Sequence, residues 1–289
     1  MNLVQSKETM VTYEPDNSIK KGYLSIFKEI FNELKSNQWL CYQLFKRDFL
    51  TLYKQSFFGI VWVFIFPLVS VGTFLILKGS GIFTFGNIQV PYPLYAILGI
   101  AFWQLFATGL IATSNSLVKA GPMIVKINFS KKSLVIASFG QAIVSFIIQI
   151  VFLGILFIYY QHMPSIIILF LPVLVLPIIL FSLGLGFILS LLNGIFRDIG
   201  NALSLLMTFC MLLTPVLYAK PVSGTFADLT NYNILYYLIC VPRNILLMGI
   251  MNSKSDWTGF FISVVLSLVF FTSCLVIFHL TETRIAERV

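Results

Sequence analysis

Residues 133–196 read SLVIASFGQAIVSFIIQIVFLGILFIYYQHMPSIIILFLPVLVLPIILFSLGLGFILSLLNGIF, a run of 64 residues without Asp, Glu, Lys or Arg. An α-helix that crosses a bilayer needs about 20 mostly apolar residues. The run is long enough for two crossings, and the polar turn Gln161-His162-Met163-Pro164 lies near its middle. It therefore predicts two transmembrane helices, over residues 134–160 and 165–192.

The rest of the chain has the same character. Of its 289 residues, 58% are hydrophobic and only 10% are charged, whereas soluble domains carry about 25% charged residues. Four further charge-free stretches, residues 57–77, 92–117, 201–218 and 257–280, predict four more spans. Ser182, Gly186 and Ser190 form a small-xxx-small pattern that predicts close helix packing. The fold class is an all-α membrane protein with six transmembrane helices.

Residues 221–249, between the fifth and sixth spans, have a mixed pattern. The segment is partly apolar but is broken by Pro221, Gly224, Pro242 and Gly249, and it contains Arg243. Its apolar part is too short to cross a bilayer. We expect a re-entrant hairpin on one face of the membrane.

The positions of the basic residues predict the orientation of the spans. An even number of spans puts both termini on one side, and 15 of the 19 Lys and Arg residues then fall on that side. Basic residues accumulate in cytoplasmic loops, so we expect both termini in the cytoplasm. The bias also explains the net charge of +8 without nucleic-acid binding.

The region before the first span, residues 1–56, is predicted to be a cytoplasmic tail followed by amphipathic helices. Apolar residues recur on one helical face from Ile19 to Leu34, and a second aromatic-rich stretch runs from Trp39 to Tyr53. Both stretches fit helices that lie along the cytoplasmic membrane interface. Packing of the first helix on a partner protein is an equal alternative. Residues 57–289 form the predicted membrane domain.

The sequence offers no catalytic or metal centre. Ion-coupled transporters need charged groups within their spans, and the predicted spans have none. The closest approach to a phosphate-binding loop, Gly81 to Gly86, is followed by Asn87 and Ile88 where Lys and a hydroxyl residue are required. The four cysteines are not paired in motifs and are interpreted as reduced packing residues; a Cys210–Cys240 disulfide on the outer face is the alternative. We expect a protein that is not an enzyme and binds no cofactor of its own.

Aromatic side chains are unusually frequent, at 16% of the chain. Trp62 and Phe66 are spaced by one helical turn on the first span, and so are Trp103 and Phe106 on the second. Such faces stack on sugar rings, so these four residues are candidates for lining a channel. The alternative is ordinary helix packing or an interfacial belt.

Several motifs, in order along the chain, resemble those of a known family. They are the stretch from Arg47 to Gly59 continuing to Pro67-Leu68, Pro91-Tyr92 followed by Gly99 and Trp103, Asn193 with Arg197-Asp198, Thr214 to Tyr218, and the ending Ile285 to Val289. Together they resemble type-2 ABC exporter permeases, in particular those that export lipid-linked O-antigen, teichoic acid or capsule. Ser130 departs from the family's usual proline after Phe129, and Ile234 departs from the usual proline after Asn233.

The resemblance implies a homodimer around a channel in the bacterial inner membrane, with two ABC ATPase subunits beneath it that hold ATP and Mg²⁺. The substrate would be a lipid-linked, O-antigen-like polysaccharide used in lipopolysaccharide biosynthesis. Residues 119–133 would form the segment that couples to the ATPase, and its basic character fits an acidic groove; topology signals alone are the alternative. The coupling candidates are Lys119, Lys126, Lys131, Lys132, Arg197 and Asp198.

The resemblance also suggests where the substrate is loaded. Arg47, Lys54 and Gln55 would contact the pyrophosphate linker near the cytoplasmic side, because Arg and Lys bind phosphate well. The alternative for the two cations is contact with lipid headgroups. The hairpin at residues 221–249 would act as an outer gate. Two other functions remain open: a type-2 permease for a drug or small lipid, and a membrane enzyme acting on lipid-linked sugars.

Overall fold

The computed structural model describes residues 23–54, 90–121, 130–221, 223–249 and 254–285, with isolated residues at 61–62, 65, 68–69, 72–73, 76, 79 and 88. Within these ranges the chain is helical and contains no strand, in agreement with the predicted all-α class. The elements, in chain order, are α1 (Tyr23–Ser36), α2 (Gln38–Lys54), α4 (Tyr92–Ser114), α5 (Ser116–Lys119), α7 (Lys131–Tyr159), the 3₁₀ helix η3 (Ile166–Phe170), α8 (Leu171–Ile195), α9 (Asp198–Leu213), α10 (Thr225–Tyr232), the π-helix η4 (Tyr236–Cys240), α11 (Val241–Met248) and α12 (Lys254–Ile285).

Four helices are long and apolar enough to cross a membrane: Tyr92–Ser114, Lys131–Tyr159, Ile166–Ile195 and Ser255–Glu282. They correspond to the predicted second, third, fourth and sixth spans. The predicted fifth span is the apolar but shorter helix α9, whose 16 residues reach only about 24 Å at 1.5 Å per residue. Most of the predicted first span lies outside the described residues, so the count of six remains a prediction.

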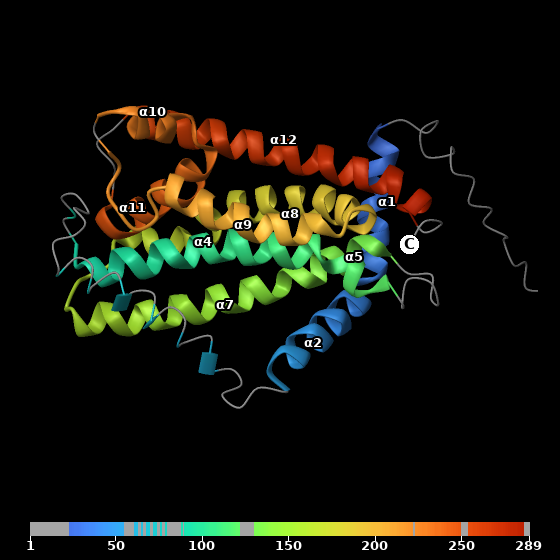
Figure 1. Cartoon of the computed structure of the whole chain (residues 1–289), viewed down its shortest axis with the longest axis horizontal. Coiled ribbons are helices and arrows are strands. Elements are labelled where there is room, and N and C mark those ends of the chain that lie inside the picture. Colours follow the sequence, from blue (N-terminus) through green and yellow to red (C-terminus); the bar gives the residue numbers. More distant parts are fainter. Residues whose placement is uncertain are drawn as a thin grey trace, which may run out of the picture.

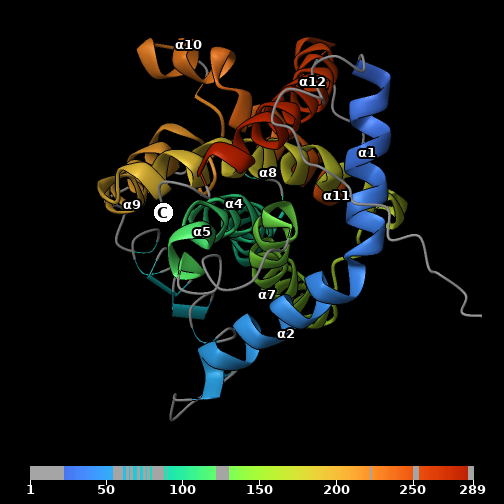
Figure 2. The same ribbon diagram turned by 90° about the vertical axis from the view of Figure 1, so that its right-hand side faces the viewer.

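The long helices run side by side, with α4 in the middle (Figures 1 and 2). α4 packs against both α7 and α8, and α8 packs against α12. Only four of the 23 residues of α4 are not buried. A helix that is apolar on all sides is stable in such a central position, and the sequence of α4 has that character.

Small residues let these helices approach closely. Gly109 of α4 lies against the Phe139 ring of α7, and Gly186 of α8 lies against Thr113 of α4. Ser182 and Ser190 are fully buried beside it, and Ser182 Oγ donates to the Phe106 carbonyl at 3.1 Å. The small-residue pattern on the fourth span is therefore confirmed as a packing surface.

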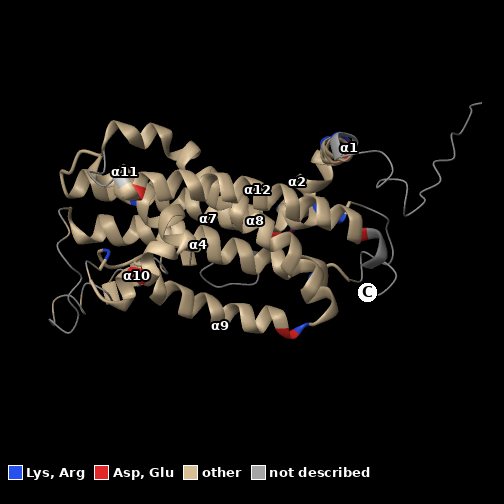
Figure 3. Cartoon of the chain, turned by 90° about the horizontal axis from the view of Figure 1, so that it is seen from above, with Lys and Arg blue, Asp and Glu red and all other residues tan. Residues whose placement is uncertain are grey.

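The two ends of the bundle differ in structure (Figure 1). The α5 end carries α1, α2, α5, the start of α7 and the final turns of α12. The α11 end carries α10, η4 and α11. Charged residues of α7, α9 and α12 lie at the ends of these helices, and the length between is uncharged (Figure 3). This distribution suits a bundle whose middle lies in hydrocarbon.

The segment predicted as a re-entrant hairpin contains three short helices. α10 is largely exposed, whereas η4 and α11 are buried against the bundle. Pro242 lies in the first turn of α11, where a missing backbone N–H is tolerated. Asn233 Nδ2 donates to Thr214 Oγ1 at 3.0 Å, and Asn233 Oδ1 accepts from the Leu235 N–H at 2.9 Å. The first contact joins the hairpin to the segment that follows α9, and the second lies within the hairpin.

Candidate functional site

The candidate coupling residues lie at the α5 end. Lys119 is the last residue of α5 and is exposed. Arg197 and Asp198 are also exposed and form the corner between α8 and α9; this charged corner protrudes from the bundle in Figure 3. Lys126 lies outside the described residues. These exposed charges are available to a partner protein.

A buried amide network lies behind this surface. Asn193, at the end of α8, is 1% exposed, and its Nδ2 donates to the Ser114 carbonyl at 3.1 Å and to Asn115 Oδ1 at 3.0 Å. Its Oδ1 accepts from the Gly200 N–H of α9 at 3.0 Å. A Cβ at Gly200 would lie 2.8 Å from Asn115 Oδ1, so there is little room for a larger residue. The amide network of Asn115, Asn193 and Gly200 thus joins the end of α4 to the α8–α9 corner.

A cluster of ionisable residues joins three other elements at the same end. Lys132, at the start of α7, is fully buried. Its Nζ donates to Glu33 Oε2 of α1 at 2.7 Å and to Glu282 Oε1 of α12. His279 Nδ1 lies 3.6 Å from the same Glu282 oxygen. Lys131 adds a hydrogen bond from Nζ to the Glu282 carbonyl at 2.6 Å.

This ion cluster of Glu33, Lys132, His279 and Glu282 changes the interpretation of two predicted coupling residues. Lys131 and Lys132 have partners within the chain, and Lys132 has no exposed surface for another protein. Glu33, His279 and Glu282 place one ligand atom each within 4.8 Å of one another. Because the Lys132 ammonium already bridges the two carboxylates, the geometry is that of a salt-bridge network.

The residues predicted to contact a phosphate begin on α2. The Arg47 guanidinium pairs with the neighbouring Asp48 carboxylate, with Nη2 2.7 Å from Oδ1, and both side chains are partly exposed. The backbone of Lys54 ends α2, but its side chain and all of Gln55 lie outside the described residues. Of the predicted phosphate contacts, the structure therefore describes the side chain of Arg47 alone, beside Asp48.

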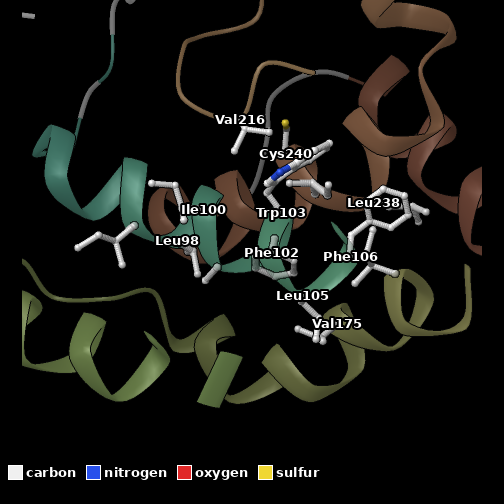
Figure 4. Close-up of a cluster of buried hydrophobic side chains, with 14 of the residues drawn as sticks. Leu98, Ile100, Phe102, Trp103, Leu105, Phe106, Val175, Val216, Leu238 and Cys240 are labelled. Atoms are coloured by element: carbon white, nitrogen blue, oxygen red, sulfur yellow. The ribbon is translucent and has the colours of Figure 1, made fainter. Parts of the chain in front are cut away.

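The predicted channel aromatics have different environments. Trp103 and Phe106 are 5% and 2% exposed and lie in the core of the bundle (Figure 4). Phe106 stacks on Phe181 of α8, with ring centroids 6.1 Å apart. Trp62 is 38% exposed, and Phe66 lies outside the described residues. The burial of Trp103 and Phe106 favours the packing alternative for these two rings.

Arg243 is a buried cation that the sequence suggested only as a charge of the outer loop. It is 1% exposed. One guanidinium nitrogen, Nη1, donates to the carbonyls of Pro215, at 3.2 Å, and of Val216, and the other, Nη2, donates to the Tyr95 hydroxyl of α4. The guanidinium carbon also lies 3.7 Å from the centre of the Tyr95 ring. Within the described residues no carboxylate pairs with Arg243.

The Arg243 contacts hold the extended segment after α9 against α4. The Tyr95 hydroxyl donates to the Tyr218 carbonyl at 3.0 Å, and Tyr92 donates to the Leu217 carbonyl at 3.1 Å. A Cβ at Gly99 would lie 2.4 Å from the Val216 carbonyl oxygen and 3.1 Å from Arg243 Nη1. Gly99 is therefore needed for the close approach. In the sequence, Arg243 is recognisable as a charged residue within an apolar segment broken by prolines. Its carbonyl partners, Pro215 and Val216, lie in another segment, and residue spacing does not predict that contact.

Comparison with known proteins finds relatives that match most of this chain. An O-antigen export system permease protein RfbA of Klebsiella pneumoniae is 27% identical over 249 residues, which cover 83% of this chain and 91% of the relative. RfbA of Myxococcus xanthus is 26% identical over 191 residues, 65% of this chain and 72% of the relative. A further RfbA of Klebsiella pneumoniae is 25% identical over 244 residues, again 83% and 91% of the two chains. The profile of the ABC-2 type transporter family matches residues 40–247, so the chain belongs to the ABC-2 type transporter family.

Proposed function

We propose that the chain is the permease subunit of an ATP-driven exporter that moves a lipid-linked, O-antigen-like polysaccharide across the bacterial inner membrane. The observation that carries this proposal is the similarity, over 65–83% of the chain, to three permeases named for O-antigen export. The long, uncharged helices of the bundle are consistent with a passive conduit. Membership of the ABC-2 type family supports a separate ABC ATPase that supplies the energy.

Coupling to the ATPase would occur at the α5 end. ATP and Mg²⁺ would be held by the ATPase, whose movement reaches this chain through Lys119 and the Arg197–Asp198 corner. The amide network then links a displacement of that corner to α4, because Asn193 bonds to both Ser114 and Gly200. The buried Lys132 cluster would keep α1, α7 and α12 together while the corner moves.

The proposal extends to the pairing, the spans and the sidedness of the chain, and the distribution of Lys and Arg supports the sidedness. Two copies would pair around the conduit, each with six spans, of which the first lies at residues 57–77 and the fifth includes α9. Both termini and the α5 end would face the cytoplasm, with α1 and α2 at the membrane interface. Residues 221–249 would form a re-entrant outer gate, and the Arg243 contacts support a fixed base for it.

Loading of the substrate would involve α2. Arg47, Lys54 and Gln55 would contact the pyrophosphate that links the saccharide to its lipid. Arg47 is partly exposed and currently bound by Asp48. A phosphate group offers the same guanidinium a stronger, bidentate partner with more negative charge, so an exchange of partners is chemically reasonable.

The test is the ATPase activity of the chain in complex with its ABC ATPase, reconstituted in lipid with and without a lipid-pyrophosphate-linked oligosaccharide. We expect the saccharide to stimulate hydrolysis, and Arg47→Ala to reduce the stimulation more than Lys46→Ala, the exposed neighbour on the same helix. A stable complex whose ATPase activity is stimulated by small amphiphiles and by no lipid-linked saccharide would indicate instead a permease for drugs or small lipids.

A further inference from the structure

The central helix α4 has one face that is not buried. Of its 23 residues, only Gln104, Thr108, Ile111 and Ala112 retain partial exposure. Their spacing of four, three and one residues places them on one side of the helix. Two of the four, Gln104 and Thr108, are polar and lie in the middle of the span, whereas its other polar side chains, Tyr92, Tyr95, Thr113 and Ser114, lie near its ends. In the middle of the span, the open side of α4 is therefore its polar side.

The neighbouring helix α7 contributes a second polar row. Gln141, Ser145 and Gln149 follow one another at intervals of four residues and so share a side of α7. Gln141 and Ser145 are partly exposed, and Gln149 is 2% exposed.

The two rows meet between the helices. Gln149 Nε2 donates to Gln104 Oε1 at 2.7 Å, and Gly109 of α4 lies against Phe139 of α7. These two contacts pair residue 104 with 149 and residue 109 with 139, so α4 and α7 are antiparallel. Thr108 lies between the two contacts, level with the part of α7 from Gln141 to Ser145. We call Gln104, Thr108, Gln141, Ser145 and Gln149 the polar seam.

The hydrogen-bonding groups of the polar seam are only partly satisfied. Gln149 Oε1 is buried and has no hydrogen-bond partner. Within the described part of the chain, the hydroxyls of Thr108 and Ser145 and the amide of Gln141 likewise have none. Other hydroxyls on the same helices behave differently: Thr113 donates to the Gly109 carbonyl at 2.8 Å, and Ser138 to the Leu134 carbonyl at 3.0 Å. Ser133 Oγ, in the first turn of α7, also has no partner, so in the described residues it is the middle of α4 and α7 where the unused groups are those of the seam.

Unused donors and acceptors within a membrane span need a polar neighbour, because hydrocarbon cannot bond to them. Residues 57–77 contain three side chains that can form hydrogen bonds, Trp62, Ser70 and Thr73, and Thr73 Oγ1 already donates to the Val69 carbonyl at 2.9 Å. That segment therefore offers fewer hydrogen-bonding side chains than the five of the seam, and lipid tails offer none. A surface of this kind fits a partner that carries many hydroxyl groups.

Resting on the proposed function, we propose that the polar seam is the wall along which the uncharged sugar residues of the polymer pass. Amides and hydroxyls both donate and accept, as sugar hydroxyls do, so each sugar can exchange one set of hydrogen bonds for the next. The seam contains no charged residue, and it therefore matches the sugar units and not the pyrophosphate linker. The open row on α4 also lies two turns from Asn115 of the amide network, which connects it to the coupling corner.

The experiment measures stimulation of the reconstituted complex by a lipid-pyrophosphate-linked oligosaccharide of neutral sugars. The double variant Q104L/Q149L replaces both partners of a hydrogen bond by apolar groups of similar size, a change that folded proteins tolerate well. We expect the saccharide concentration for half-maximal stimulation to rise about tenfold, the effect of one or two lost hydrogen bonds. Thr108→Val and Ser145→Ala should shift it in the same direction, and their matched controls Thr113→Val and Ser138→Ala should not.

The possible results separate a failure of the seam proposal from a failure of the proposed function. If the wild-type complex responds to no lipid-linked saccharide, the proposed function fails, and the seam proposal fails with it. If the wild type responds and folded seam variants respond at the same concentration, only the seam proposal is overturned. A seam variant that loses its self-association, measured by light scattering, would also overturn it, because the seam would then be a contact between two copies. Unfolding temperature and retention of the ATPase establish that each variant is folded.

Discussion

Two buried cations show opposite ways of stabilising a positive charge in this chain. Lys132 at the α5 end is paired with two carboxylates, Glu33 and Glu282. Arg243 at the α11 end is surrounded by backbone carbonyls and a tyrosine. The planar guanidinium has five donors and is weakly hydrated, so it suits several neutral acceptors at once. Arg243→Lys would replace this fork by a compact ammonium with three donors and would leave some of these acceptors unsatisfied.

Lys132→Met should destabilise the chain strongly. Removing the ammonium leaves two facing carboxylates without their cation, and breaking a buried ion pair costs about 3–5 kcal/mol. The measurement is the unfolding temperature of the purified protein in detergent. Lys119→Met, at the exposed lysine of the same end, is the control and should be close to wild type. Equal unfolding temperatures for the two variants would contradict the buried cluster.

Gly99→Ala should also lower stability, by about 1–3 kcal/mol, the usual effect of overpacking. The added methyl group would lie 2.4 Å from the Val216 carbonyl and force the segment after α9 away from α4. Gly154→Ala on α7 meets no atom within 4 Å, and helix propensity makes it neutral or slightly stabilising. Thermal unfolding of the two variants tests the close approach of Gly99 to the Val216 carbonyl. An unfolding temperature of Gly99→Ala equal to that of the wild type would argue against this approach.

The structure shows which of the predicted coupling residues are exposed, and their coupling role stays a prediction. Lys119, Arg197 and Asp198 are exposed at one end of the bundle, as coupling candidates must be. Lys132 was predicted to couple, yet its carboxylate partners are 99 and 150 residues away in the chain. The sequence alone does not distinguish a basic residue that binds a partner protein from one that pairs with a glutamate of the same chain.

At the scale of elements, charge-free runs were sufficient to predict the long spans. Bilayer thickness sets the length of a span, and the four candidate membrane helices, Tyr92–Ser114, Lys131–Tyr159, Ile166–Ile195 and Ser255–Glu282, each overlap one predicted range. The ends of α4 and α9 were not predictable in this way. α4 stops at Ser114, where Asn115 turns the chain into α5. α9 stops at Leu213, where the backbone becomes extended at Thr214 before Pro215.

The amide network that joins α4, α8 and α9 should govern the coupling of ATP hydrolysis to transport. Asn193→Ala removes the amide that bonds Ser114, Asn115 and Gly200, so movement of the corner would no longer reach α4. We expect the reconstituted complex to hydrolyse more ATP for each saccharide exported. Leu192→Ala, on the exposed neighbour, is the control. An unchanged ratio of ATP hydrolysed to saccharide exported would show that the amide network does not transmit the movement.

On the scale of the whole molecule, the two ends of the bundle should lie on opposite sides of the membrane. The α5 end carries Lys119 and the α11 end carries Ser223, and both residues are exposed. In spheroplasts, an impermeant maleimide should label Ser223→Cys directly and Lys119→Cys only after permeabilisation. Both variants are made in a Cys210→Ser background, because Cys210 is partly exposed. The other native cysteines should label weakly, because Cys240 and Cys274 are buried and burial raises the pKa of the Cys41 thiol, which lowers its reactive thiolate fraction. Labelling of both positions from one side would contradict the proposed topology.

We propose that the chain conducts a lipid-linked saccharide when its ATPase hydrolyses ATP. The most direct measurement is transport in proteoliposomes that contain the complex and a lipid-pyrophosphate-linked oligosaccharide with a labelled terminal sugar. The outward-facing ATPase should drive the label to the inner leaflet, where an added glycosidase cannot remove it, and this protection should require ATP and this chain. Full glycosidase sensitivity in the presence of active ATPase, together with ATP-dependent movement of a small amphiphile, would contradict the claim.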